Sequence, residues 1–129
     1  MLNVQALIID DNPHNIVVLS QLLLIEGVIA HQISPALSIG LQLEKMVSVD
    51  IIFLDLEMPH VDGYQVLRLI RENEKLARTK VIAYSVHFAE LNSTLDLGFD
   101  GFLGKPLDAE LFPEQLQRIL NGERVVYFP

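Results

Sequence analysis

The feature that most constrains the fold is the stretch Ile51-Ile52-Phe53-Leu54-Asp55, in which four apolar residues end in a carboxylate. A run this short, rich in β-branched and aromatic residues, predicts a strand that is buried on both faces. Such strands occur in parallel sheets covered by helices, where ligands bind at the carboxyl ends of the strands. We therefore expect Asp55 at the mouth of a crevice, although the pattern also fits an aspartate that only ends a strand or caps a turn.

Strand-like and helix-like segments alternate along the rest of the chain. Four further apolar runs predict strands, at residues 4–9, 28–33, 80–84 and 99–103. Helical periodicity and capping signals predict five helices, at residues 13–26, 35–46, from about 62, 88–97 and 108–120. The pairs Asn12-Pro13 and Ser34-Pro35 mark the first two helix starts. Pro113 lies too deep for a regular first turn, so we expect the last helix to start irregularly.

Five strands alternating with five helices imply an α/β domain with a doubly wound parallel sheet and right-handed crossovers. We expect the strand order 2-1-3-4-5, which is the flavodoxin-like order. The chain has 129 residues, enough for one buried core, and we assign residues 1–122 to a single domain. The apolar tail at 123–129 could pack back on the domain, contact a partner, or mark where a longer chain was cut.

Carboxylates follow two strands that are neighbours in this order. Asp10 and Asp11 come after the first strand and Asp55 ends the third, so their side chains should converge at one edge of the sheet. Three carboxylates this close must raise a pKa or bind a cation. The chain has no cysteine and its four histidines form no ligand pair. The oxygen ligands therefore predict a hard cation, Mg²⁺ in the cell.

Two further polar residues follow the fourth and fifth strands. Ser85 and Lys105 would lie at the same edge as Asp55. A hydroxyl and an ammonium beside a metal-bound carboxylate can bind phosphoryl oxygens, and carboxylates can act as nucleophiles that form aspartyl-phosphate. Taken singly, Ser85 fits a strand cap and Lys105 a surface lysine, so their joint placement carries the interpretation.

The net charge of −8 argues against direct contact with nucleic acid and favours cations or basic protein surfaces as partners. The N-terminus lacks the pattern of a signal peptide, and no apolar run approaches the length needed to span a membrane. We therefore expect a soluble, cytoplasmic protein without membrane contact, which the absence of cysteine also suits.

From about residue 4 to 120 the sequence resembles the receiver domain of two-component response regulators, in the single-domain form of the chemotaxis receivers. The matching motifs are Asp10-Asp11, Asp55-Leu56-Glu57-Met58-Pro59, Asp62-Gly63, Ser85 and Lys105-Pro106. The resemblance implies that Asp55 accepts a phosphoryl group from the phosphohistidine of a histidine kinase or phosphotransfer protein, with Lys105 and Ser85 as further catalytic residues. Such a domain is a signalling switch that catalyses only its own phosphorylation and dephosphorylation.

The resemblance also implies a metal site and an output path. The Mg²⁺ ligands would be Asp10, Asp11, Asp55 and the backbone carbonyl of Glu57. Ser85 and Phe102 would form the switch that reshapes the face made by the fourth helix, fifth strand and fifth helix, where a downstream protein binds; homodimerisation stays open. The lysine-proline bond at this place is usually cis in the family, so the resemblance makes Lys105-Pro106 a candidate for the cis isomer. Val86 stands where the family commonly has a smaller residue, and we expect it to slow loss of the phosphoryl group.

Three alternative functions remain open on the sequence. A flavin mononucleotide carrier would share the fold, but Asp10-Asp11 would repel the phosphate that such proteins bind after the first strand. A haloacid-dehalogenase-like phosphatase also uses a strand-end aspartate with Mg²⁺, but usually has Asp-x-Asp where this chain has Asp55-Leu56-Glu57. The third is a receiver-like scaffold that is never phosphorylated.

Overall fold

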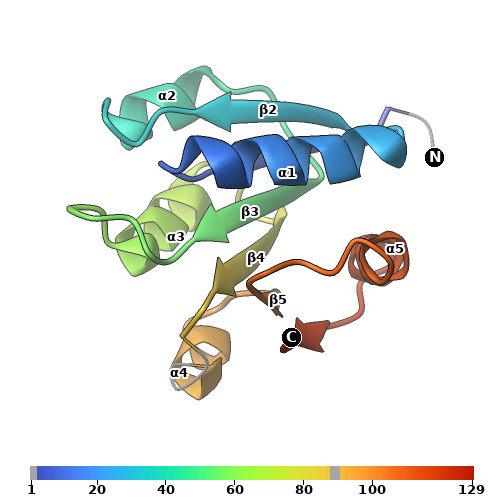
Figure 1. Ribbon diagram of the computed structural model, residues 1–129. Coiled ribbons are helices and arrows are strands. Elements are labelled where there is room, and N and C mark those ends of the chain that lie inside the picture. The colour runs from blue at the N-terminus through green and yellow to red at the C-terminus, as the bar shows by residue number, and fades with distance from the viewer. Residues whose placement is uncertain (1–2, 88–90) are drawn as a thin grey trace.

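A computed structural model of the chain describes residues 3–87 and 91–129 and contains a parallel sheet in the order β2-β1-β3-β4-β5-β6 (Figure 1). The strands are β1 (Gln5–Ile9), β2 (Ile29–Ile33), β3 (Ile51–Asp55), β4 (Lys80–Ser85), β5 (Gly101–Gly104) and β6 (Val126–Tyr127). The flavodoxin-like order of the first five strands is confirmed, with the more polar β2 at one edge. A sixth strand, which the sequence did not predict, extends the other edge.

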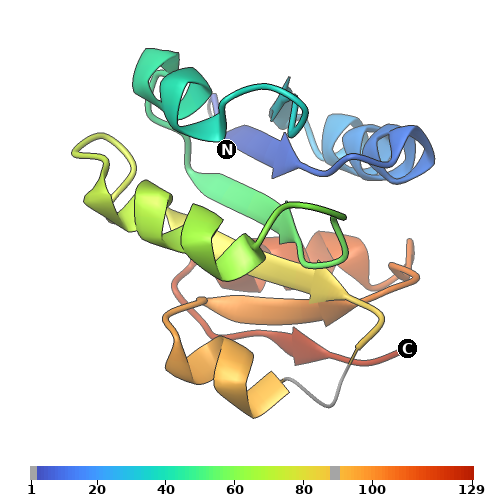
Figure 2. The same cartoon turned by 90° about the vertical axis from the view of Figure 1, so that its left-hand side faces the viewer.

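Helices cover both faces of the sheet (Figures 1 and 2). They are α1 (Pro13–Ile25), α2 (Ile39–Lys45), α3 (Gly63–Glu72), α4 (Leu91–Asp96) and α5 (Phe112–Leu120). Helices α1 and α5 pack on one face, and α2, α3 and α4 pack on the other. In β3, Ile51 and Phe53 belong to the first layer whereas Ile52 and Leu54 belong to the second, so the strand is buried on both faces as predicted.

The start of the second helix was predicted wrongly. Helix α2 begins at Ile39 and is capped by Ser38, whose hydroxyl accepts a hydrogen bond from Leu41 N at 3.3 Å. Ser34 instead closes a separate turn, in which its carbonyl accepts from Leu37 N at 3.2 Å. Serine caps short turns as readily as helices, and the two signals lie only a few residues apart, so the sequence alone favoured the wrong one.

The last helix also starts later than predicted. Asp108 caps a turn, in which its carboxylate accepts from Glu110 N at 2.8 Å and Leu111 N at 3.2 Å, and α5 follows from Phe112. Pro113 therefore lies in the first turn of α5, where it disrupts no hydrogen bond. Of the helix predicted at 88–97, residues 88–90 lie outside the described part of the chain, and the rest forms α4.

The C-terminal tail packs back on the domain. Strand β6 pairs in parallel with β5, and Phe102 N donates to the carbonyl of Val125 at 2.9 Å. The Phe128 ring lies against the Phe102 ring, with centroids 6.0 Å apart. Across residues 3–87 and 91–129, none of the helices has the length and apolar character needed to cross a membrane.

Candidate functional site

Three carboxylates meet at the carboxyl edge of the sheet. Strands β1 and β3 are paired, so Asp10 and Asp11 after β1 lie next to Asp55 at the end of β3. One oxygen from each side chain lies within 4.8 Å of those of the other two. Asp10 and Asp55 are buried, whereas Asp11 is exposed. The predicted convergence of these three residues is therefore present in the structure.

Asp10 is held in place from two sides. One of its oxygens accepts a hydrogen bond from Asn12 N at 2.9 Å, and the other accepts from the Tyr84 hydroxyl. Tyr84 faces Asp55 in the β3–β4 register, and its ring lies beneath Lys105, with Nζ 4.7 Å from the ring centroid. Burial, followed by the hydrogen bond to Asp10, raises the pKa of Tyr84 well above the ordinary tyrosine value. Tyr84 thus stays protonated and acts as a fixed hydrogen-bond donor.

The carboxylate of Asp55 lies among donors and other acids of the site, and its pKa is raised. Its carboxylate accepts from Lys105 Nζ at 2.6 Å and from Glu57 N at 3.0 Å. Burial raises the pKa of Asp55 from 3.8 to about 6, and the neighbouring Asp10 adds to this rise, whereas Lys105 and the Glu57 N–H oppose it. At neutral pH the carboxylate is ionised but poorly solvated, which suits a nucleophile.

The donor set fits a magnesium ion. Carboxylate oxygens are hard ligands, and Mg²⁺ typically binds to one or two carboxylates together with water and phosphate oxygens. Burial is the main cause of the raised pKa of Asp55 and Asp10 adds to it, so a cation between these carboxylates would stabilise their ionised forms. Asp10, Asp11 and Asp55 would supply the side-chain oxygens. The part assigned to the Glu57 backbone carbonyl stays a prediction.

Ser85 and Lys105 both reach this edge, but their partners differ. Lys105 binds Asp55 directly, whereas the Ser85 hydroxyl donates to Oε2 of Glu57 at 2.6 Å. Val86 N donates to Oε1 of the same carboxylate at 2.8 Å, and Lys105 Nζ lies 3.7 Å from it. Sequence reasoning missed the Tyr84 side chain, and it placed the charge of Glu57 at the opening without predicting the hydrogen bonds of its carboxylate. The only sequence feature that pointed to either residue was its position, because Glu57 lies two residues after Asp55 and Tyr84 lies one residue before Ser85.

Phe102 lies on β5 beyond the site. Its ring is fully buried in the layer under α2, α3 and α4, faces Ala83 in the register, and contacts Phe128. Two residues after β4, His87 N donates to Ser85 Oγ at 2.9 Å. The Lys105-Pro106 bond is cis, as the resemblance implied, and Lys105 N donates to the Ser85 carbonyl at 2.9 Å. Ser85 and the start of the β5–α5 loop are thus directly bonded.

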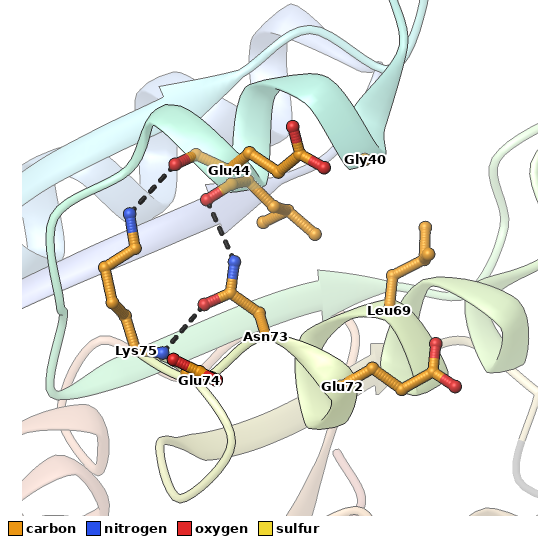
Figure 3. Close-up of a pocket in the computed structure, with 8 residues that line it drawn as sticks. Gly40, Glu44, Leu69, Glu72, Asn73, Glu74 and Lys75 are labelled. Carbon is orange, nitrogen blue, oxygen red and sulfur yellow. Dashed lines mark hydrogen bonds between the residues drawn. The ribbon is translucent and has the colours of Figure 1, made fainter.

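A cleft of about 540 Å³ opens over Asp55, and His14, Asn15 and Val18 of α1 line one wall. A second pocket, of about 520 Å³, lies between the C-terminal ends of α2 and α3 (Figure 3). There Lys75 Nζ donates to the Glu44 carbonyl at 2.9 Å, and Asn73 donates to the Leu43 carbonyl at 3.2 Å. These polar groups tie the two helix ends together, and the three clustered aspartates are not among the residues that line this pocket.

Comparison with known proteins identifies the family of the chain. A family model described as the response regulator receiver domain matches residues 6–117. The hybrid signal transduction histidine kinase L of Dictyostelium discoideum is 37% identical over 113 residues, which cover 80% of this chain and 6% of that protein. The signal transduction histidine-protein kinase BarA of Escherichia coli K12 is 28% identical over 120 residues, covering 91% of this chain and 13% of the kinase. The chain thus spans a small part of these curated relatives.

Solved structures show the same fold. The receiver domain of sensor histidine kinase PA1611 from Pseudomonas aeruginosa PAO1 has a TM-score of 0.75 and 27% identity, covering 92% of this chain and 95% of that one. That structure has a magnesium ion coordinated in its active-site cleft. The chemotaxis response regulator CheY4 of Vibrio cholerae has a TM-score of 0.78 at 20% identity, covering 91% and 98%.

Proposed function

The chain belongs to the response regulator receiver family of two-component signalling, and we propose that Asp55 is the residue that accepts the phosphoryl group. Members of this family act as signalling switches that work with histidine kinases and downstream effectors. The observation that carries the proposal is the contact of Asp55 with Lys105, at 2.6 Å, inside the cluster that Asp10 and Asp11 complete. This arrangement combines a nucleophile, a cation and metal ligands in one cleft.

The proposed reaction is transfer from a phosphohistidine. A carboxylate oxygen of Asp55 attacks phosphorus, the P–N bond breaks, and its electron pair leaves with the imidazole, which is thereby free to take a proton. Lys105 lies close enough to offset the charge of the phosphoryl oxygens. Because the pKa of Asp55 is about 6, the side chain is mostly ionised at neutral pH and available for attack.

Mg²⁺ would be held by the backbone carbonyl of Glu57 and by the carboxylates of Asp10, Asp11 and Asp55. When bound, Mg²⁺ would offset the negative charge of the phosphoryl oxygens during transfer. The Tyr84 hydroxyl and the Asn12 N–H fix the orientation of Asp10. These contacts support a preformed metal site, which lowers the cost of ordering ligands when the ion binds.

We assign the input and output to different surfaces. A phosphohistidine would enter the cleft along α1, where His14, Asn15 and Val18 form the wall. The output would pass through Ser85 and Phe102 to the α4–β5–α5 face, where a downstream protein binds. In this chain β6 and Phe128 lie against that face, so the C-terminal segment would be part of the output surface.

Mass spectrometry after incubation with Mg²⁺ and acetyl phosphate tests the proposal. We expect the mass of one phosphoryl group to be added to the wild type and to be absent from Asp55→Asn. Asp96→Asn, which changes an exposed aspartate of α4, is the matched control and should be modified like the wild type. No modification of the wild type would favour the scaffold alternative, and equal modification of Asp55→Asn would overturn the assignment of the acceptor.

A further inference from the structure

The carboxylate of Glu57 accepts two hydrogen bonds and lies near one ammonium group. It accepts from the Ser85 hydroxyl at 2.6 Å and from Val86 N at 2.8 Å. Lys105 Nζ lies 3.7 Å away, at the distance of an ion pair and beyond that of a hydrogen bond. Glu57 comes from the loop after β3, whereas these three groups come from the ends of β4 and β5. The side chain therefore links the loop after β3 to the carboxyl ends of β4 and β5.

The same donors suit a phosphoryl group on Asp55. Lys105 bonds to Asp55 at 2.6 Å, and Glu57 N donates to Asp55 at 3.0 Å, so the donor cluster directly adjoins the proposed acceptor. A phosphoryl group has three terminal oxygens and needs several converging donors. A second anion in the same place would meet strong repulsion. The Glu57 carboxylate and the phosphoryl oxygens thus compete for one set of donors.

The bond lengths show which contact matters for Glu57. Lys105 lies 1.1 Å closer to Asp55 than to Glu57, so its charge is already taken up by Asp55. The short bonds of Glu57 are to the neutral Ser85 hydroxyl and the Val86 N–H. Ser85 is fully buried and also accepts from His87 N at 2.9 Å. Glu57 therefore holds the hydroxyl in one orientation rather than merely balancing the lysine.

We propose that Glu57 is an internal ligand of the phosphoryl-oxygen site, which restrains Ser85 in the unphosphorylated protein and must be displaced before the phosphoryl group can bind there. This inference rests on the function proposed for Asp55. It makes Glu57 a specificity-determining residue, because its displacement costs free energy that a small phosphodonor supplies poorly. A protein donor can supply that free energy from its own contacts with the cleft.

Titration with beryllofluoride in saturating Mg²⁺ tests the inference. Beryllofluoride mimics a phosphoryl group on a carboxylate, and its binding can be followed by tyrosine fluorescence, because the chain has three tyrosines and no tryptophan. Glu57→Gln keeps the shape of the side chain but removes its charge, and Glu57→Ala removes the competing acceptor altogether. Glu72→Gln is the matched control, since it removes one negative charge from the distant pocket of Figure 3.

We expect both Glu57 variants to lower the half-saturating beryllofluoride concentration by roughly tenfold or more, the effect of losing competition for charge-assisted hydrogen bonds. Glu72→Gln should stay within about twofold of the wild type, the scale of weak surface electrostatics. Unchanged or weaker binding by the Glu57 variants, with normal binding by the wild type, would overturn the inference and leave the proposed function intact. A wild type that behaves like Asp55→Asn would overturn both.

A measurement on the wild type keeps the test independent of whether the variants fold. The carboxyl ¹³C resonance of Glu57 and the amide resonance of Val86 should both move when beryllofluoride is added, because the hydrogen bond between them breaks. A Glu57 resonance that stays in place while Val86 moves would show that the carboxylate is not displaced, which contradicts the inference.

Discussion

Raising the pH of the metal-free protein should lower its free energy of unfolding through Asp55. The pKa of this side chain is about 6 in the folded protein, whereas the ordinary aspartate value of 3.8 applies to the unfolded chain. Burial is the main cause of the rise. The folded chain therefore binds the proton more tightly than the unfolded chain. The contribution of Asp55 to stability is fully present below pH 3.8 and is lost as the pH rises through about 6.

The magnitude follows from the two pKa values. A rise of this size corresponds to roughly 3 kcal/mol between the protonated and ionised forms. The carboxylate lines a cleft that is open to water, which screens part of the charge, so we expect about 1–2 kcal/mol. For a domain of this size that loss corresponds to a fall in Tm of roughly 3–8 °C.

Urea unfolding followed by circular dichroism, in a chelator, measures the effect when wild type and Asp55→Asn are compared at pH 4 and pH 7.5. The variant should be more stable than the wild type at pH 7.5, and the difference should shrink towards zero at pH 4. Groups away from the cleft titrate equally in both proteins and cancel in the comparison. A difference that is the same at both pH values, or that grows on acidification, would refute the reasoning.

Magnesium should reverse this pH dependence. The ion binds the ionised carboxylates and stabilises the folded chain in proportion to its occupancy. We therefore expect Mg²⁺ to raise the Tm of the wild type more at pH 7.5 than at pH 4, and to raise that of Asp55→Asn less. An equal rise in both proteins at both pH values would place the ion away from the three aspartates.

Three further predictions concern neighbouring residues. Tyr84→Phe removes the hydroxyl donor from buried Asp10 and should cost about 1.5–3 kcal/mol of stability and weaken Mg²⁺ binding by calorimetry; wild-type values for both would contradict the role assigned to that hydroxyl. Gly101→Ala places a Cβ 2.7 Å from the carbonyl oxygen of Val125 and should cost about 1–3 kcal/mol while increasing amide exchange in β6, so full protection of β6 would argue against the clash. Val86→Ala shortens a side chain that lines the cleft and should speed the decay of the phosphorylated protein. An equal or slower decay would show that Val86 does not hinder the access of water to the phosphoryl group.

The sheet was predictable because its strands are short apolar runs bounded by clear turn signals. In β3 the burial of the four apolar residues before Asp55 follows directly from their composition. Strand β6 was not predictable, because Val126 and Tyr127 form a strand only through pairing with β5, a contact between distant parts of the chain. Helix starts failed for a local reason: Ser34 and Ser38 carry the same capping chemistry, and tertiary packing decides between them.

The site was predictable to the extent that topology alone brings residues together. Parallel strands end at one edge, so strand order was enough to bring Asp10, Asp55 and Lys105 to the same place. The roles of Tyr84 and Glu57 depend instead on side-chain direction. The Tyr84 hydroxyl donates to Asp10 across β3, and the two residues are 74 positions apart in the chain. Spacing in the sequence cannot predict a hydrogen bond between side chains so far apart.

The charges of the cleft link the metal, the phosphoryl group and Glu57. The ammonium of Lys105 bonds to Asp55 and lies 3.7 Å from Glu57, whereas Asp10 and Asp11 add two further carboxylates to the cluster. The negative charges are therefore poorly balanced without a cation. A phosphoryl group adds a charge of about −1.5 to −2 at neutral pH. If Asp55 is the acceptor, as we propose, phosphorylation would be favoured by a bound divalent cation and by the departure of a carboxylate from the donor cluster. The proposed displacement of Glu57 agrees with the exposure of the two side chains, which is 22% for Glu57 and 2% for Asp55.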